Sequence, residues 1–351
     1  MAEQLASPYL EALEDQRAAL VGALRGRVGT DVVDEAQRRS ARLSVRLDAS
    51  PLDEDTAAAV DRGDLPHLAL ATGATNGAGW ARALGLEGMP TQDIAAVEYA
   101  GVRAAQLDEP ALAEGFFAAP TDTLVALQRR IVAGLLADDL LGALRRTSRA
   151  VNDGAQGRVI FHAPDPSTLR RLLADLDAWV RSARDRHPPL VVAGVVHLRV
   201  LHWRPFEAGN GRVARAASRV ALRAAGGDPW GVAVPEDRWA LDPLAYVSEV
   251  AATIRRRSDL VPWIERTAEA VVASLEDLAR RLDVGPPGGT VRGLHECERL
   301  EPGAQITLPE YAVACDIDRL SALSDLNQLC WTGLLERDVG THGLRYARRR
   351  G

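Results

Sequence analysis

The chain has 351 residues, of which 47% are hydrophobic, and this is enough for about two domains with buried cores. Its net charge of −6 argues against general nucleic-acid binding. No run of about 18 apolar residues occurs, and the N-terminus lacks a basic region followed by an apolar one, so we expect neither a membrane span nor a secretion signal. All 42 basic residues are arginine, which excludes Schiff-base chemistry and a phosphate-loop lysine.

The three cysteines, Cys297, Cys315 and Cys330, lie far apart and never form a C-x-x-C pair. This spacing disfavours both a disulfide framework and a zinc site. We therefore expect buried thiols in a protein of the reducing cytoplasm.

Two helices are expected at residues 8–24 and 31–47, where apolar residues recur at near-helical spacing. Residues 60–110 are rich in Gly, Ala and Thr, and we assign no chemistry to them. Together these segments make up an N-terminal helical region of residues 1–110.

Residues 111–146 return to helical spacing. The stretch after them contains two glycines, a Val-Ile-Phe run and then Pro164 and Pro166, which predicts a β-hairpin near residues 154–162.

Two more helices should follow this hairpin. Residues 167–184 form an amphipathic pattern that Ser167 is placed to cap. Residues 190–203 follow a Pro-Pro pair and are apolar almost all round, so we expect a buried central helix rather than a strand.

The segment 204–215 has the pattern of an anion-binding loop. Gly209 and Gly211 free the backbone for a concave turn, and the helix expected to begin near Asn210 points its positive end at that turn. Arg212 and Arg215 are three residues apart and share a helix face, so both can grip phosphate oxygens. The alternative is a Gly-Asn-Gly turn before a surface helix. An anionic partner explains the two cations better, because the helix dipole opposes cations at this end.

These residues resemble the central motif of the Fic (Fic/Doc) family, H-P-F-x-[D/E]-G-N-G-R-x-x-R. The matching positions are Pro205, Phe206, Gly209, Asn210, Gly211, Arg212 and Arg215. The resemblance implies a mainly α fold, with a helical core domain at residues 111–282 and a small β-hairpin flap. It also implies a nucleotide-binding protein related to enzymes that transfer AMP from ATP to a hydroxyl.

Two positions depart from the family motif. The family's catalytic histidine falls on Arg204, and its acidic Mg²⁺ ligand falls on Ala208. Arginine stays protonated and has no lone pair to act as a base, and alanine has no oxygen to bind a metal. We therefore expect ordinary AMP transfer to be lost or altered, and we do not expect a Mg²⁺ site. Glu207 is the neighbouring carboxylate that we consider as a surrogate base or metal ligand.

The stretch from Ser44 to Asp48 resembles, in weakened form, the inhibitory motif [S/T]-x-x-x-E-[G/N] of many Fic proteins. The resemblance implies that Asp48 pairs with Arg215, the second motif arginine. The alternative is an ordinary helix end at Asp48.

Histidines offer no obvious replacement for the missing base. We expect His197 to be a hydrogen-bonded core residue, His202 to face away from the cleft, and His162 to be exposed on the hairpin.

Residues 284–289 form a Pro-Gly linker, and residues 288–351 have the helix–turn–helix and hairpin pattern of a winged helix. The helix that would read DNA contains Asp325 and a single basic residue, Arg319, so DNA is not an expected partner.

Three functions remain open. The chain could be a Fic-type transferase, a pseudoenzyme that binds a nucleotide and signals through its flap or winged helix, or a Fic scaffold diverted to other phosphate chemistry. In the last case Arg204 would act as a third anion clamp in place of Mg²⁺. The expected ligand is ATP or another phosphorylated small molecule. A protein target at the flap and a homodimer are further expectations.

Overall fold

The computed structural model describes residues 5–66, 90–152, 157–256, 259–284, 296–297, 299–331, 333–340 and 343–349. The chain divides into two compact units, and one of them is Gly29–Ala270. The other combines Gln4–Val28 with Val271–Gly351. The sequence placed residues 4–28 in the N-terminal region. They group with the C-terminal part because α1 (Pro8–Leu24) packs against α15 (Arg319–Trp331).

The unit Gly29–Ala270 is mainly helical with one small hairpin, as predicted. Its helices before the hairpin are α2 (Thr30–Leu47), α3 (Glu54–Asp61), α5 (Thr91–Gly115), α6 (Pro120–Ile131) and the 3₁₀ turn η1 (Asp138–Leu140). After the hairpin come η2 (Pro166–Thr168), α7 (Leu169–Ala183), α8 (Pro189–Trp203), α9 (Asn210–Ala224), α10 (Glu236–Trp239), α11 (Pro243–Arg255) and the first part of α12 (Val261–Arg281).

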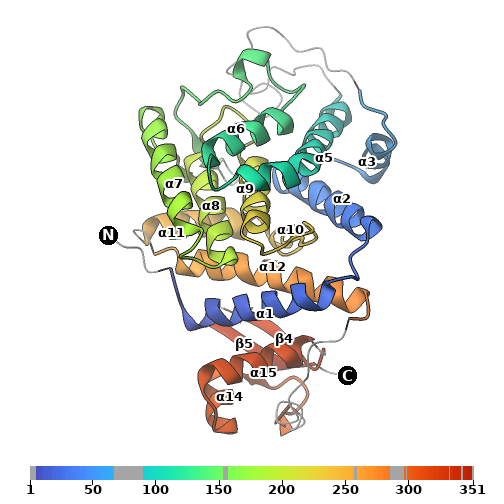
Figure 1. Ribbon diagram of the computed structural model, residues 1–351, viewed down its shortest axis with the longest axis vertical. Helices are drawn as coiled ribbons and strands as arrows, with labels where there is room; N and C mark the ends of the chain where they lie inside the picture. The colour runs from blue at the N-terminus through green and yellow to red at the C-terminus, as the bar shows by residue number, and fades with distance from the viewer. Residues whose placement is uncertain are drawn as a thin grey trace. The chain divides into compact units, whose positions relative to one another are not determined.

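The centre of this unit is the pair α8 and α9 (Figure 1). The expected helix over residues 190–203 is confirmed, and nearly every side chain of α8 is buried. Pro189 starts α8 without losing a hydrogen bond, because the first amides of a helix have no partner within it. Helix α9 also packs against α2, α5 and α6, so four helices pack around α9 and hold its position.

Two expectations about neighbouring helices are wrong. Residues 111–146 are not one helix, because α5 ends at Gly115 and α6 ends at Ile131. A Cβ at Gly101 would lie 2.5 Å from the Ile131 carbonyl oxygen, so only glycine lets α5 pack against the end of α6. Ser167 does not cap α7. The Asp165 carboxylate accepts the Ser167 amide and caps η2, while the residue before α7, Thr168, makes no side-chain cap.

The predicted hairpin consists of β1 (Ala150–Asn152) and β2 (Val159–His162), which pair antiparallel. The register shifts between Val151 and Asn152. The tip of the expected hairpin, residues 153–156, lies outside the described residues. Val151 and Phe161 are buried while their neighbours are more exposed, so one face of this flap packs on the helices.

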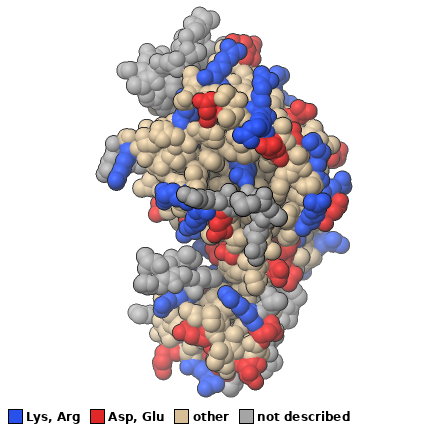
Figure 2. Space-filling view, turned by 90° about the vertical axis from the view of Figure 1, so that its left-hand side faces the viewer, with Lys and Arg blue, Asp and Glu red and all other residues tan. Residues whose placement is uncertain are grey.

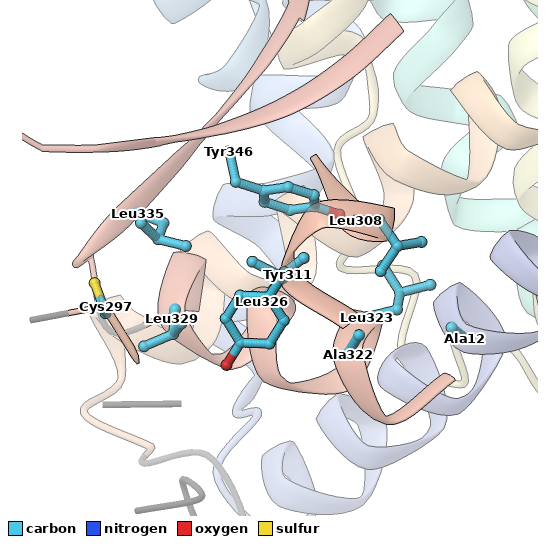
Figure 3. Close-up of a cluster of buried hydrophobic side chains, with 10 residues drawn as sticks. All are labelled: Ala12, Cys297, Leu308, Tyr311, Ala322, Leu323, Leu326, Leu329, Leu335 and Tyr346. Carbon is cyan, nitrogen blue, oxygen red and sulfur yellow. The ribbon is translucent and has the colours of Figure 1, made fainter. Parts of the chain in front are cut away.

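The second unit has its own core, which Figure 3 shows. Its elements besides α1 and α15 are the last part of α12, β3 (Gln305–Ile306), α14 (Leu308–Cys315), β4 (Leu335–Gly340) and β5 (Gly343–Arg348). The strands form a sheet in the order β3-β5-β4. Tyr346 of β5 and Leu335 of β4 pack with Tyr311, Leu326 and the other side chains drawn. The two helices α14 and α15 and the hairpin β4–β5 follow the expected pattern, while the winged-helix assignment remains a prediction.

The expected linker at residues 284–289 lies almost wholly outside the described residues. None of the helices that the structure describes is both long enough and apolar enough to cross a membrane. Cys297 is buried, Cys315 and Cys330 are half-buried, and all three are free thiols.

Candidate functional site

The loop between α8 and α9 is shaped by two left-handed residues. Arg204 ends α8 with φ 44°, and Gly209 precedes α9 with φ 75°. The Asn210 side chain accepts the Phe206 amide and donates to the Phe206 carbonyl, which closes the loop. No side chain of the described residues caps α9, so its first amides and its positive end are directed at the loop.

The carboxylate of Asp48, at the end of α2, lies against this helix start. A Cβ at Gly211 would be 2.3 Å from Asp48 Oδ1, so only glycine admits the carboxylate at this position. Asp48 accepts a hydrogen bond from Arg215 Nη2 at 2.9 Å and lies 3.5 Å from Arg212 Nε. The predicted ion pair between Asp48 and Arg215 is confirmed. An anion is therefore already held where the sequence predicts an anion site.

The charges around Asp48 determine its ionisation. Burial alone would raise the pKa of Asp48, but Arg215 and Arg212 outweigh burial and hold that pKa below its usual value. Arg215 is 2% exposed and also donates from Nε to Ser44 Oγ at 2.8 Å and from Nη2 to the Ser44 carbonyl at 2.6 Å. Both Ser44 and Asp48 thus bind Arg215, while their inhibitory role remains a prediction.

Arg212 has a second partner that the sequence analysis missed. Glu98 of α5 lies with Oε1 3.0 Å from Arg212 Nη2, and the two side chains are 1% and 4% exposed. Burial raises the pKa of Glu98, and the charge of Arg212 limits that rise. Arg212 Nη1 is buried and has no hydrogen-bond partner among the described residues. Arg212 is therefore neutralised by α5 but keeps a free donor.

Arg145, which the sequence analysis also missed, anchors the start of this loop. It is 2% exposed and donates from Nε to the Arg204 carbonyl at 2.7 Å and from Nη2 to the Trp203 carbonyl at 3.1 Å. Its other hydrogen bonds go to the carbonyls of Thr147 and Pro164, on either side of the flap. One guanidinium thus joins the end of α8 to both ends of the hairpin.

A cavity of about 420 Å³ adjoins these residues. Its polar lining includes Arg204, Arg212 and Arg215 together with the backbone of Gly209–Gly211. The apolar lining includes Leu47, Val151, Leu201 and Val247. Burial lowers the pKa of Arg204, and Asp48 opposes this shift. Arg204 therefore reaches the predicted site, and its Nε is buried without a hydrogen-bond partner.

Glu207 lines the same cavity but is engaged by the chain leading into the flap. Its carboxylate accepts from Arg149 Nη2 at 2.7 Å and from the Arg146 amide at 3.0 Å. These contacts join the loop to the flap. The role of Glu207 as a surrogate base or metal ligand remains a prediction.

The histidines lie as expected. His197 is completely buried, with Nε2 2.6 Å from the Tyr246 hydroxyl, and burial lowers its pKa to about 3. His202 packs edge-on against Phe161 and does not line the cavity, and burial lowers its pKa to about 4. His162 is exposed on β2. None of these rings is placed as a general base for the cavity.

The residues around the cavity do not fit a Mg²⁺ ion. Ala208 has no oxygen, Asp48 is bound by two arginines, and Glu207 is bound by Arg149. Within the described residues, no three His, Cys, Asp or Glu side chains meet in a group that could hold a metal.

The C-terminal arginines show little that suits nucleic acid. Arg337 lies 3.6 Å from Glu276 Oε1 and donates to Asn327. Figure 2 shows basic and acidic side chains interspersed over one face, with no continuous basic surface among the coloured residues.

Comparisons with known proteins give one family. The model of the Fic/DOC family matches residues 118–222. A Fic family protein from Desulfovibrio desulfuricans G20 has a similar structure, with a TM-score of 0.62, 17% identity, and coverage of 100% of this chain and 99% of that one.

Two further structures are similar over most of the chain. Fic-1 from C. elegans gives a TM-score of 0.52 at 17% identity and covers 78% of this chain and 72% of its own. A Fic domain containing signaling protein from Bacteroides thetaiotaomicron VPI-5482 gives a TM-score of 0.53 at 16% identity, with coverage of 80% of this chain and 98% of that one. At such identities the likeness shows the fold. A search of curated proteins found no match.

Proposed function

We propose that this protein binds a nucleotide or another phosphorylated ligand at the start of α9. The match of residues 118–222 to the Fic/DOC family model supports this, because members of that family typically transfer nucleotides or other phosphate-containing groups. In this proposal it has lost ordinary AMP transfer. Binding needs no Mg²⁺, and Arg204 supplies the positive charge that the metal provides in the family.

The observation that carries this proposal is the position of the Asp48 carboxylate. It lies against Gly211 at the positive end of α9 and contacts both motif arginines. A carboxylate and a phosphate oxygen need the same donors, namely backbone amides and guanidinium groups. A phosphate that displaces Asp48 would find these donors in place, together with the free donor of Arg212.

The loss of catalysis follows from the chemistry of two positions. Arg204 has no lone pair with which to take a proton, and loss of a general base costs about 10²–10⁴ in rate. His197 is no substitute, because it is fully buried and bonded to Tyr246. Ala208 leaves the metal position without a ligand, so charge on the phosphates must be neutralised by arginine alone.

The flap supports a partner as well. In the described part of the chain β1 and β2 pair only with each other, so the hairpin has a free edge. An extended segment of a target protein can add to such an edge by backbone hydrogen bonds. We include a protein target at the flap in the proposal.

Isothermal titration calorimetry with AMP, ADP and ATP tests the proposal, each with Mg²⁺ and with EDTA. We expect Asp48→Ala protein to bind AMP equally well in both buffers. Arg212→Ala in that background should weaken binding about tenfold or more. Arg171→Ala, an exposed arginine of α7, is the matched control and should change nothing.

A restored variant completes the test. Arg204→His combined with Ala208→Asp returns the family pattern and should make binding depend on Mg²⁺. The proposal fails if Asp48→Ala protein binds none of these ligands, or if it needs Mg²⁺ as strongly as the restored variant does. Transfer of labelled AMP by the natural protein, abolished by Arg212→Ala, would refute the loss of activity.

A further inference from the structure

The carboxylates of Asp48 and Glu98, which pair with the motif arginines, differ in whether a ligand can displace them. We propose that Glu98 is a specificity-determining residue, which sets the charge of the site so that it takes the dianion of a phosphate monoester in preference to a metal-free nucleoside triphosphate. The inference rests on the proposed function, because it concerns the same cavity.

The arginines at the cavity are mostly paired. The ion pairs are Arg149 with Glu207 at 2.7 Å, Arg212 with Glu98 at 3.0 Å and Arg215 with Asp48 at 2.9 Å. Arg204 also lines the cavity and has no ion-pair partner within the described residues. When Asp48 leaves, the unbalanced charges are those of Arg204 and Arg215, which amount to two positive charges.

Glu98 cannot exchange in the way Asp48 can. Its side chain is 1% exposed and projects from the middle of α5, a helix packed against α2, α6 and α9. Asp48 is 27% exposed and lies at the end of α2. A ligand can replace the carboxylate of Asp48, but it meets Arg212 already neutralised by Glu98.

Two positive charges suit a phosphate monoester. Above pH about 6 the monoester carries nearly two negative charges and three strong acceptor oxygens. Arg204, Arg215 and the free Nη1 of Arg212 are donors for those oxygens. A triphosphate without metal brings more negative charge than two arginines neutralise, and unneutralised buried charge is costly.

The rest of the cavity suits the uncharged part of such a ligand. Its volume of about 420 Å³ lies within the range of small-molecule sites. Leu47, Val151, Leu201 and Val247 line it beside the arginines. An apolar or planar group attached to the phosphate would cover this lining.

The test compares AMP with ATP in EDTA, by calorimetry on Asp48→Ala protein, in which the site is open. We expect AMP to bind at least as tightly as ATP. Adding Glu98→Gln keeps the size of the side chain but removes its charge, and should shift the affinity ratio at least tenfold toward ATP. Glu109→Gln is the matched control, since Glu109 is a buried glutamate of α5 that pairs with Arg219, outside this cavity. It should leave the ratio unchanged.

A second measurement does not depend on a Glu98 variant that folds. AMP affinity of Asp48→Ala protein should fall several-fold from pH 7 to pH 5, as the monoester takes up a proton. The inference is overturned, while the proposed function stands, if ATP binds tenfold more tightly than AMP, if Glu98→Gln leaves the ratio unchanged, or if AMP affinity is constant over this pH range. If neither ligand binds, both the inference and the proposed function fail.

Discussion

Replacing Asp48 by alanine removes the anion that lies at the start of α9. Arg215 then keeps its two hydrogen bonds to Ser44 but loses its charged partner. A charge-assisted hydrogen bond contributes about 1.5–3 kcal/mol. Asp48 is 27% exposed beside a cavity. The loss of folding free energy should therefore stay below the roughly 3–5 kcal/mol that is typical when one partner of a fully buried ion pair is removed.

This cost can be measured by thermal unfolding followed by circular dichroism at pH 7. For a domain of this size, about 2–4 °C corresponds to each kcal/mol, so the Tm should fall by about 3–12 °C. AMP at 100 times its Kd should return about 2.7 kcal/mol to the variant. It should stabilise the natural protein much less, because Asp48 competes for the site.

The control for this experiment is Asp48→Glu, which keeps the charge and should retain most of the stability. An unchanged Tm in Asp48→Ala protein would show that the ion pair with Arg215 contributes nothing. Equal stabilisation of the natural and variant proteins by AMP would show that Asp48 does not occupy the phosphate position.

Three further predictions follow from single contacts. Gly211→Ala should lower the Tm of the natural protein, because the new Cβ would clash with Asp48. In the Asp48→Ala background it should raise the Tm or leave it unchanged, because alanine favours the helix, and equal effects in both backgrounds would contradict the clash. The His197 ring should show no titration between pH 4 and 8 by NMR, since burial lowers its pKa to about 3. Because histidine in the unfolded chain protonates near pH 6.5, the contribution of His197 to stability should fall as the pH drops from about 6.5 toward 3. Arg145→Lys should speed amide exchange in residues 203–209, because lysine cannot bind four carbonyls at once; unchanged exchange there would exclude a positioning role for Arg145.

The sequence predicted the centre of the fold well because its signals there are local. A Pro-Pro start and an apolar run mark α8, and the Gly-Asn-Gly turn marks the start of α9. The Ser44 and Asp48 contacts with Arg215 were also foreseen, through the weak motif on α2.

Glu98 and Arg145 could not be found in the same way. Glu98 lies in a stretch whose composition suggested no chemistry. A signal was present, because Ile94 and Val102 lie one turn before and after it on a buried face. A glutamate on such a face needs a buried partner, but the partner is far along the chain. Arg145 binds backbone carbonyls, which every residue carries, so no sequence pattern marks its targets.

The grouping of α1 with α15 affects the order in which the two units can fold during synthesis. Synthesis proceeds from the N-terminus, so α1 leaves the ribosome before the whole of Gly29–Ala270, and α15 leaves after it. Gly29–Ala270 can fold before the C-terminal residues that pack with Tyr9 and Ala12 of α1 have been synthesised. A fragment that stops at residue 270 would keep every residue of the cavity lining but leave α1 without that core. Such a fragment should therefore stay in solution only if residues 1–28 are removed as well.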